Sequence, residues 1–326
     1  MTAQHWTARP MTVADGATVA DLLNEQHQML IGRDVADADD ITTWLSMPNG
    51  DLGRDSRILL DDERAVASLI VEGRTRSNLV KVFVSLGRTK QRPAVADRLL
   101  TLVAEHARVS ADAAGLVDPV IEVEEVPSGD TDLEAELTDR GYAPVRRSVE
   151  LSLTLTPDLP SPSLPSGIAL VTVDLTDPIH LEALAQIEAE AFEDHDGDLV
   201  LQRDELVHVL TTDPKYLTDL QLLAVDTTAG PLPGAAVAMS LAASMSTEDA
   251  PTGYVMSLGV RRSWRGQGIG RALLLTQFHA FVRHGWQVAK LHVQVDNRTG
   301  ADRLYTSLGM EPVSGFAVWA GRLPAP

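Results

Sequence analysis

Three glycines alternate with other residues in the turn Arg265-Gly-Gln-Gly-Ile-Gly270, which stands between two apolar segments. The segment before it, Tyr254–Val260, predicts a strand, and the segment after it repeats apolar residues at helical spacing. Unpaired backbone N–H groups and the positive end of the helix dipole meet at the start of such a helix. The turn therefore predicts a phosphate or diphosphate site, although the same glycines also suit a tight turn that binds nothing.

The spacing of the glycines separates this turn from commoner nucleotide-binding loops. A dinucleotide-binding turn reads G-x-G-x-x-G after an early strand, whereas Gly266, Gly268 and Gly270 read G-x-G-x-G late in the chain. A Walker loop requires G-K-[ST], and this sequence contains none. Arg265 and Arg271 flank the glycines and supply charge that a diphosphate would use.

The length of 326 residues favours two domains of about 160 residues each. The segment Leu155–Gly167 holds four prolines and no apolar period, which is typical of an extended linker. We therefore expect residues 1–156 to form one domain, 157–166 a Pro/Ser-rich linker and 167–326 a second domain.

The second half alternates predicted helices and strands. Apolar periodicity and turn residues predict these elements in the following order: His180–Phe192 (helix), Leu201–Leu210 (helix), Leu220–Val225 (strand), Ala235–Ala243 (strand), Tyr254–Val260 (strand), the helix after Gly270, Val288–Val295 (strand), Ala301–Leu308 (helix) and Val313–Ala320 (strand). This order indicates a mixed α/β fold.

Two local matches suggest that the first half repeats the same plan. Ser85-Leu86-Gly87 ends a predicted strand as Ser257-Leu258-Gly259 does, and Gly141-Tyr142 follows a short helix as Gly309-Met310 does. Self-similarity at about half the chain length is typical of a duplicated domain.

The glycine turn resembles the cofactor motif [Q/R]-x-x-G-x-[G/A] of the GNAT N-acetyltransferase superfamily. A second block, in which Asn297 is followed by Leu304-Tyr305 and Leu308-Gly309-Met310, resembles the family's N…A…LY…LGF segment. The resemblance implies two tandem GNAT-like domains of the α/β class, each a mixed, mostly antiparallel sheet flanked by helices.

The resemblance also implies which residues bind acetyl-CoA or another acyl-CoA. In the family, the amides of the turn hold the pyrophosphate, and a bulged strand before the turn pairs with the pantetheine arm. The residues of this chain at those positions are Leu258, Gly259, Val260, Arg265, Gly266, Gln267, Gly268, Ile269, Gly270, Arg271 and Asn297.

The reaction implied by the resemblance is direct attack of a substrate amine on the thioester, with Tyr305 as the general acid for the leaving thiolate. The backbone amide of Val260 is a candidate for polarising the thioester carbonyl. Candidate acceptor-binding residues are Glu193, Asp194 and His195 after the first helix of the second half, together with His292. Each of these four also suits a structural or solvated position.

The first half departs from the motif. Arg88–Val95 stands where the glycine turn should lie, but it has no glycine and Pro93 removes an amide. The tyrosine is also lost near Gly141, because Leu137 and Thr138 occupy the corresponding positions. We expect a degenerate N-terminal domain that serves packing or shapes the acceptor site.

Composition narrows the class of protein. The net charge of −19 disfavours a nucleic-acid-coating protein, and the histidines show no metal-binding spacing. No apolar run approaches the roughly 20 residues of a membrane span, and the start of the chain lacks a secretion signal, so we expect a cytoplasmic monomer or homodimer. With no cysteine, transfer cannot pass through a thiol of the protein.

The predicted function is therefore acyl-CoA-dependent N-acylation of a small-molecule amine, without a metal. A mycothiol-synthase-like reaction is a more specific alternative, because that enzyme is also a tandem GNAT protein with an active C-terminal half. A non-catalytic acyl-CoA sensor or scaffold and a protein N-terminal acetyltransferase are further alternatives.

Overall fold

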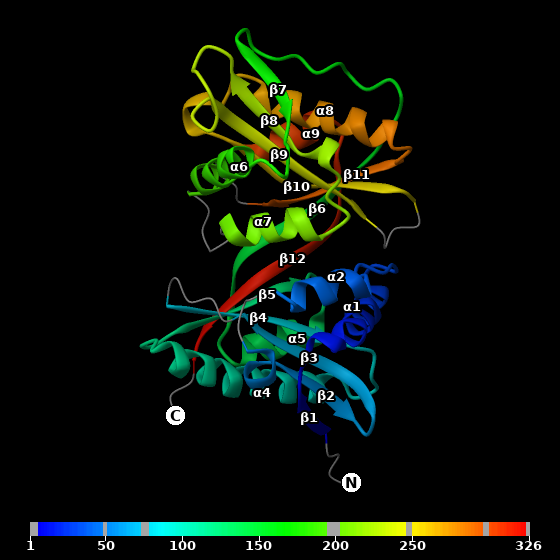
Figure 1. Ribbon diagram of the computed structural model, residues 1–326. Helices are drawn as coiled ribbons and strands as arrows, with labels where there is room; N and C mark the ends of the chain where they lie inside the picture. The colour runs from blue at the N-terminus through cyan, green and yellow to red at the C-terminus, as the bar shows by residue number, and fades with distance from the viewer. Residues whose placement is uncertain are drawn as a thin grey trace. The chain divides into compact units, whose positions relative to one another are not determined.

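The computed structural model describes residues 6–47, 51–72, 78–193, 203–245, 250–295 and 300–323. Its contacts divide the chain into two compact units: unit 1 comprises Met1–Val149, Gln294–Arg298 and Ser314–Pro326, and unit 2 comprises Glu150–Val293 and Thr299–Val313. Each unit holds a mixed sheet with helices on its faces (Figure 1).

Unit 1 begins with a five-strand arrangement in which neighbouring strands in the chain pair with one another. Its strands are β1 (Trp6–Pro10), β2 (Arg57–Asp61), β3 (Arg64–Glu72), β4 (Leu79–Leu86) and β5 (Val120–Pro127). The pairs from β1 to β4 are antiparallel, and β4 runs parallel to β5. Its helices are α1 (Gly16–Leu30), α2 (Ala38–Leu45), α3 (Leu52–Asp55), α4 (Arg92–Ala114) and α5 (Thr131–Asp139).

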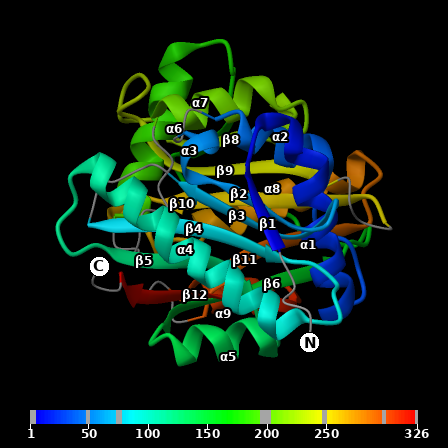
Figure 2. The same ribbon diagram turned by 90° about the horizontal axis from the view of Figure 1, so that it is seen from below.

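Strand alternation gives the sheet of unit 1 two apolar faces. Leu69 and Val71 belong to a core that includes residues of α4, whereas Ile70, between them, packs with residues of α1 and α2. Successive side chains of a strand point to opposite faces, so α4 covers one face and α1 with α2 covers the other. Figure 2 shows α4 lying across the strands of this unit.

Unit 2 follows the same order of pairing. Its strands are β7 (Ile168–Thr172), β8 (Leu222–Asp226), β9 (Ala236–Met245), β10 (Thr252–Val260) and β11 (Val288–Gln294). The pairs from β7 to β10 are antiparallel, and β10 runs parallel to β11. Its helices are α6 (Pro178–Ala191), α7 (Arg203–Thr212), α8 (Ile269–Arg283) and α9 (Ala301–Ser307).

Helices also cover both faces of the sheet in unit 2. Leu223 of β8 packs with residues of α6 and α7, whereas its neighbours Leu222 and Ala224 pack with Ile269 and Leu273 of α8. Figure 1 shows α6 and α8 on different sides of β8–β10. The predicted mixed, mostly antiparallel sheets flanked by helices are thus confirmed, and β7 is a strand that the periodicity did not predict.

Two long strands carry the chain between the units. β6 (Ala143–Thr154) runs from unit 1 into unit 2, and β12 (Glu311–Arg322) begins in unit 2 and ends in unit 1. No helix in the described ranges is both long and apolar enough to cross a membrane.

The end of β12 lies in a different unit from the one that its position in the sequence suggests. The range 167–326 predicts that it completes the second domain, but Phe316–Arg322 pairs antiparallel with β5 of unit 1. Trp319 belongs to the core beneath α4, and a Cβ at Gly321 would lie 2.7 Å from the ring of Tyr142. Contacts made far apart in the sequence therefore assign Ser314–Pro326 to unit 1.

Replacing Trp319 tests this assignment. The side chain is 8% exposed, so Trp319→Ala should cost about 3–5 kcal/mol through the cavity it leaves in the core of unit 1. Hydrogen exchange should accelerate in β4 and β5 and stay unchanged in β8–β10. Trp286→Ala is the control, because the Trp286 ring lies 5.2 Å from Phe281 of unit 2 and its loss should loosen unit 2 instead. Equal loosening of β8–β10 by Trp319→Ala would contradict the assignment.

Candidate acyl-CoA site

The parallel strands of unit 2 stop pairing before either of them ends. They pair only at Thr252–Tyr254 of β10, which lie opposite Val288–Lys290 of β11. β10 then continues to Val260 with β9 on its other edge. The second half of β10 therefore has one edge that no strand pairs with in the described part of unit 2, where an extended ligand can bind.

The direction of the backbone groups along β10 can be traced from one hydrogen bond. The N–H of Arg261, just after the strand, donates to Val237 O of β9 at 3.0 Å. Because N–H groups of neighbouring residues in a strand point to opposite edges, those of Leu258 and Val260 point away from β9. Both residues were expected from the sequence to contact the pantetheine arm, and their geometry supports that prediction.

The bulge in β10 lies earlier than the sequence suggested. The register shifts between Val255 and Ser257, so the expectation of a bulge around Gly259 is wrong. Gly259 has another reason to lack a side chain, because a Cβ there would lie 3.0 Å from the Cβ of Ala191 and 3.3 Å from Cγ2 of Ile187. It allows α6 to pack closely on the strand.

The glycine turn leaves the start of α8 uncovered. Gly266 and Gly268 have φ of 75° and 83°, in the left-handed region that favours glycine. Gly268 is the N-cap residue of α8 and offers no side chain to the first N–H groups. A Cβ at Gly266 or Gly268 would meet no heavy atom within 4 Å in the described residues. The backbone therefore fits an approaching diphosphate.

Gly270 serves packing. A Cβ there would lie 3.6 Å from Leu304 and Val260, an ordinary van der Waals contact. A side chain at Gly270 would therefore point toward β10 and α9, whereas one at Gly266 or Gly268 would point into open space. Because a Cβ would fit here, the geometry also explains why the family motif accepts either Gly or Ala at this position.

The two arginines of the turn are held by the protein itself. Arg265 donates from Nε to Val260 O at 3.1 Å and from Nη2 to Ala191 O at 3.0 Å. Its guanidinium thus fixes the turn to β10 and α6, and its contact with a diphosphate stays a prediction. Arg271 donates from Nη1 to Ser307 Oγ of α9 at 3.0 Å. Gln267 is exposed in the turn and Ile269 is buried beneath it.

Tyr305 lies on α9 with 7% of its surface exposed. Burial raises the pKa of Tyr305 to about 12, so the phenol is protonated at neutral pH. Its hydroxyl has no hydrogen-bonding partner among the described residues and is available to a ligand.

The other expected site residues are distributed as follows. Glu193 is exposed just after α6, and Asp194, His195 and Asn297 lie outside the described residues. The side chain of His292 is 42% exposed, and its Nε2 lies 3.6 Å from Glu150 Oε2. Of the described candidates for the acceptor, His292 is thus the one in a polar cluster.

Glu188 is a candidate that the sequence analysis missed. It is 6% exposed, and its Oε2 accepts a hydrogen bond of 2.8 Å from Ser257 Oγ, beside the bulge of β10. Burial raises the pKa of Glu188 to about 7, and the hydrogen bond from Ser257 opposes that rise. The signal was present in the sequence, because Glu188 lies on the apolar stripe of Leu181, Leu184 and Ala191 at positions i, i+3, i+7 and i+10.

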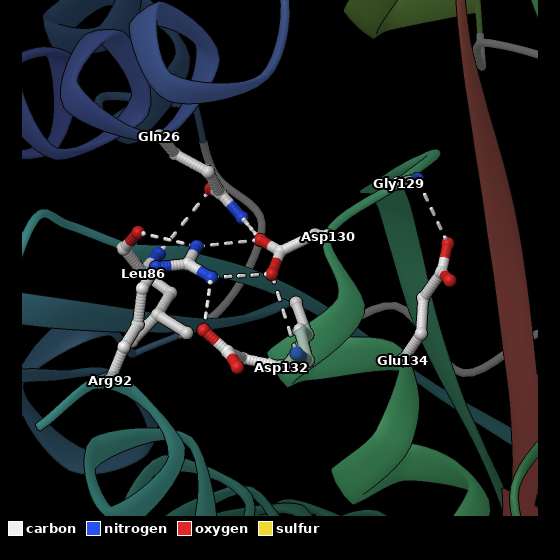
Figure 3. A network of polar contacts seen from close by, with 8 residues as sticks. Gln26, Leu86, Arg92, Gly129, Asp130, Asp132 and Glu134 are labelled. Atoms are coloured by element: carbon white, nitrogen blue, oxygen red, sulfur yellow. Dashed lines mark hydrogen bonds and ion pairs between the residues drawn. The ribbon is translucent and has the colours of Figure 1, made fainter.

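In unit 1, polar side chains gather at the end of the parallel pair β4 and β5 (Figure 3). Arg92, the first residue of α4, donates to both carboxylate oxygens of Asp130 at 2.6 and 2.7 Å and to Leu86 O at 3.1 Å. Gln26 Nε2 donates to Asp130 at 2.6 Å. Burial alone would raise the pKa of Asp130, but the bonds from Arg92 and Gln26 hold it below its ordinary value. This network ties the end of β4 to the start of α5.

The comparison with protein families decides what unit 2 is. Residues 183–310 match the model described as the acetyltransferase (GNAT) family. These residues form a GNAT acetyltransferase domain. The match includes β10, the glycine turn, α8 and α9, so the resemblance predicted from the sequence motifs is confirmed.

One similar curated protein is a mycothiol acetyltransferase from Nocardia farcinica (strain IFM 10152). The two chains are 31% identical over 160 residues, which cover 48% of this chain and 50% of the relative. The chain thus spans about half the length of this curated relative in the alignment.

Solved structures match nearly the whole chain. A GCN5-related N-acetyltransferase from Sphaerobacter thermophilus has a TM-score of 0.75 and 25% identity, covering 98% of this chain and 96% of that one. A tandem GNAT protein from the clavulanic acid biosynthesis pathway has a TM-score of 0.69 and 15% identity, covering 99% and 100%. The predicted tandem GNAT architecture is confirmed. The contacts of individual site residues with acetyl-CoA stay predictions.

Within the described residues, no three His, Asp or Glu side chains lie close enough together to hold a metal ion.

Substitution of Gly268 tests the site. Gly268→Ala forces alanine into a φ of 83°, so the turn should shift and the affinity for coenzyme A should fall roughly tenfold or more, which corresponds to about 1.4 kcal/mol. Gly285→Ala is the matched control, because Gly285 has a φ of 77° and equally open surroundings but lies beyond the far end of α8. Calorimetric titration should show unchanged affinity in that control. Equal losses of coenzyme A affinity in both variants would mean that backbone strain, and not the position of Gly268 in the site, causes the loss.

Proposed function

We propose that the GNAT domain transfers the acetyl group of acetyl-CoA directly to a small-molecule amine. The observation that supports this proposal is that no side chain caps the start of α8, and that β11 does not pair with the second half of the neighbouring strand β10. Both features belong to one strand–turn–helix segment. The start of α8 suits the diphosphate of a ligand, and the unpaired edge of β10 suits its extended arm.

In this proposal, the chain's backbone does most of the binding. The N–H groups at Gly266 and Gly268 receive the diphosphate, and Leu258 and Val260 pair with the pantetheine arm through the open edge of β10. The N–H of Val260 is the donor for the thioester oxygen, where negative charge develops as the amine attacks. Arg265 keeps these groups in register by bonding Val260 O to the turn.

Tyr305 is the proposed general acid. A departing thiolate takes a proton from the nearest acidic group, and a phenol with a pKa of about 12 is fully protonated at neutral pH. The burial of α9's tyrosine keeps this proton in place until a ligand sulfur approaches.

We also propose that unit 1 binds no acyl-CoA. Its helix α4 starts with Arg92 and Pro93 where α8 has Ile269 and Gly270, and the guanidinium of Arg92 bonds to Leu86 O at the end of β4. The chain's own side chains therefore occupy the position that unit 2 leaves open to a ligand.

A mycothiol-synthase-like reaction is a second, more specific candidate. The similarity to the mycothiol acetyltransferase of Nocardia farcinica supports it, although the aligned part covers half of that protein. The amine acceptor of that enzyme belongs in a panel with amino sugars, amino acids and polyamines, with each acetylated product identified by mass.

The role of Tyr305 is tested by removing its hydroxyl. Tyr305→Phe should lower the rate of acetyl transfer by about 10²–10⁴-fold and leave the affinity for acetyl-CoA unchanged, because only the proton donor is lost. Release of the CoA thiol measures the rate for acceptors that carry no thiol, and the protein contributes no background since it has no cysteine.

Tyr142→Phe is the matched control for this test. Tyr142 is also 7% exposed and burial raises its pKa to about 12, but it lies in unit 1. The Tyr142 variant should keep full activity. Unchanged turnover in Tyr305→Phe would rule out the acid assignment, and failure of the wild-type protein to bind acetyl-CoA would rule out the proposed function.

A further inference from the structure

A set of polar side chains lies on the face of unit 2 that α6 covers. On β10, Leu258 and Val260 pack with residues of α8, so Ser257, between the bulge and Leu258, points to the opposite face. There its Oγ bonds Glu188 of α6. The contact places a buried carboxyl group beside the segment of β10 that carries the open edge.

Tyr254 points to the same face on the other side of the bulge. A Cβ on its neighbour Gly253 would lie 2.5 Å from the ring of Phe281 in α8, so Gly253 faces α8 and Tyr254 faces away from it. Lys290 lies directly opposite Tyr254 in the parallel register, and directly paired residues share a face. His292, two residues further along β11, shares that face and packs edge-to-face on the Tyr254 ring at 5.5 Å.

The two buried carboxylates of this face differ in their partners. Glu150 of β6 is 6% exposed and lies 3.3 Å from the ammonium of Lys290, which is itself 4% exposed. Glu188 bonds the neutral hydroxyl of Ser257, and no cation pairs with it among the described residues. A buried carboxylate without a counter-ion has a strong tendency to take a proton or to attract a cation.

Among the described residues, no charged group on the elements packed against α6 pairs with Glu188. On α7, Arg203 bonds Glu182 and Asp204, and His208 lies on the same helix. β9 carries no titratable residue, and β10 carries only Tyr254.

The arginines that follow β10 are engaged as well. Arg261 lies 3.4 Å from Glu190 Oε2, and Arg265 bonds main-chain carbonyls. The described surroundings therefore leave the charge of Glu188 uncompensated.

We propose that Glu188 takes the proton of the acceptor's ammonium group and so prepares the amine for attack. The inference rests on the proposed function, because it assigns a role in acetyl transfer to Glu188, which lies on the face of the unit 2 sheet opposite α8. An ammonium substrate supplies the cation that Glu188 lacks, and Ser257 holds the carboxylate in position. The acceptor class is thus a primary amine that arrives protonated.

The proton balance of the reaction is complete with these groups. Glu188 takes one proton from R–NH₃⁺, and the free amine forms an N–C bond with the thioester carbonyl. The C–S bond breaks as Tyr305 donates a proton to the sulfur, and the second proton of the amine nitrogen returns to the Tyr305 oxygen. The products are the acetamide and CoA thiol, and Glu188 releases its proton to water.

The pKa of Glu188 near 7 supports this role. Because a base acts in its deprotonated form, turnover should rise with pH through about 7 and level off above it. Loss of the hydrogen bond from Ser257 removes the group that lowers this pKa, so Ser257→Ala should move the rise to higher pH.

The experiment combines Glu188→Gln with the pH dependence of turnover. Glu188→Gln keeps the size of the side chain and an acceptor for Ser257 but cannot take the proton. We expect turnover of the best amine in the panel to fall about 10²–10⁴-fold and the rise near pH 7 to disappear, with acetyl-CoA affinity unchanged by calorimetry.

Glu190→Gln is the matched control, because Glu190 lies on the same helix, is 44% exposed and pairs with Arg261. It should keep both the rate and the pH profile of the wild-type protein.

The outcomes separate this inference from the proposed function. Retention of the rise near pH 7 in Glu188→Gln would overturn the inference, and so would binding of acetyl-CoA without turnover of any primary amine. Absence of acetyl-CoA binding in the wild-type protein would instead overturn the proposed function.

Discussion

The start of α8 is the constraint on which the site depends, because a helix always leaves its first N–H groups without partners in the helix. Most helices satisfy these groups with a capping side chain, but Gly268 has none. The residues around the turn hold this arrangement in place. Arg265 ties the turn to β10 and to the end of α6. The backbone donors are thus rigidly placed, and an anion can bind there without the protein reorganising.

The two units show that the end of a parallel strand pair can be filled by the protein's own side chains or left accessible to a ligand. Each has a parallel pair of strands joined by a long helix, and the pairs correspond as β4 with β5 and β10 with β11. In unit 1, Arg92 and Gln26 reach Asp130 after β5 and fill the end of the pair with buried, bonded charge. A buried ion pair of this kind is costly to disrupt, since removal of one partner leaves the other charge uncompensated. Unit 2 has glycines and backbone N–H groups in the same place, which suits a ligand that comes and goes.

Local sequence patterns predicted most elements of unit 2 but not β7, because the predicted helices and strands carry strong apolar periods and the turn carries glycine. They could not predict the strand partner of Trp319, which depends on contacts with residues about two hundred positions away. The family resemblance implied a bulged strand at Leu258, Gly259 and Val260, whereas Gly259 allows close packing of α6 on the strand. The direction of the Arg265 guanidinium was also beyond the sequence, since a charged group beside a phosphate turn can serve the ligand or the turn. Glu188 was missed because a carboxylate on a helix is usually solvated, although its place on the apolar stripe indicated burial.

The most direct test of the account is to follow the backbone amides of the turn by nuclear magnetic resonance while coenzyme A is added. We predict saturable shifts for Gly266 and Gly268 in the turn and for Leu258 and Val260 on β10. Pantetheine, which lacks the diphosphate, should move the β10 resonances and leave those of the turn in place. If coenzyme A leaves Gly266 and Gly268 unmoved, or if its largest shifts appear around Arg92 in unit 1, the central claim is contradicted.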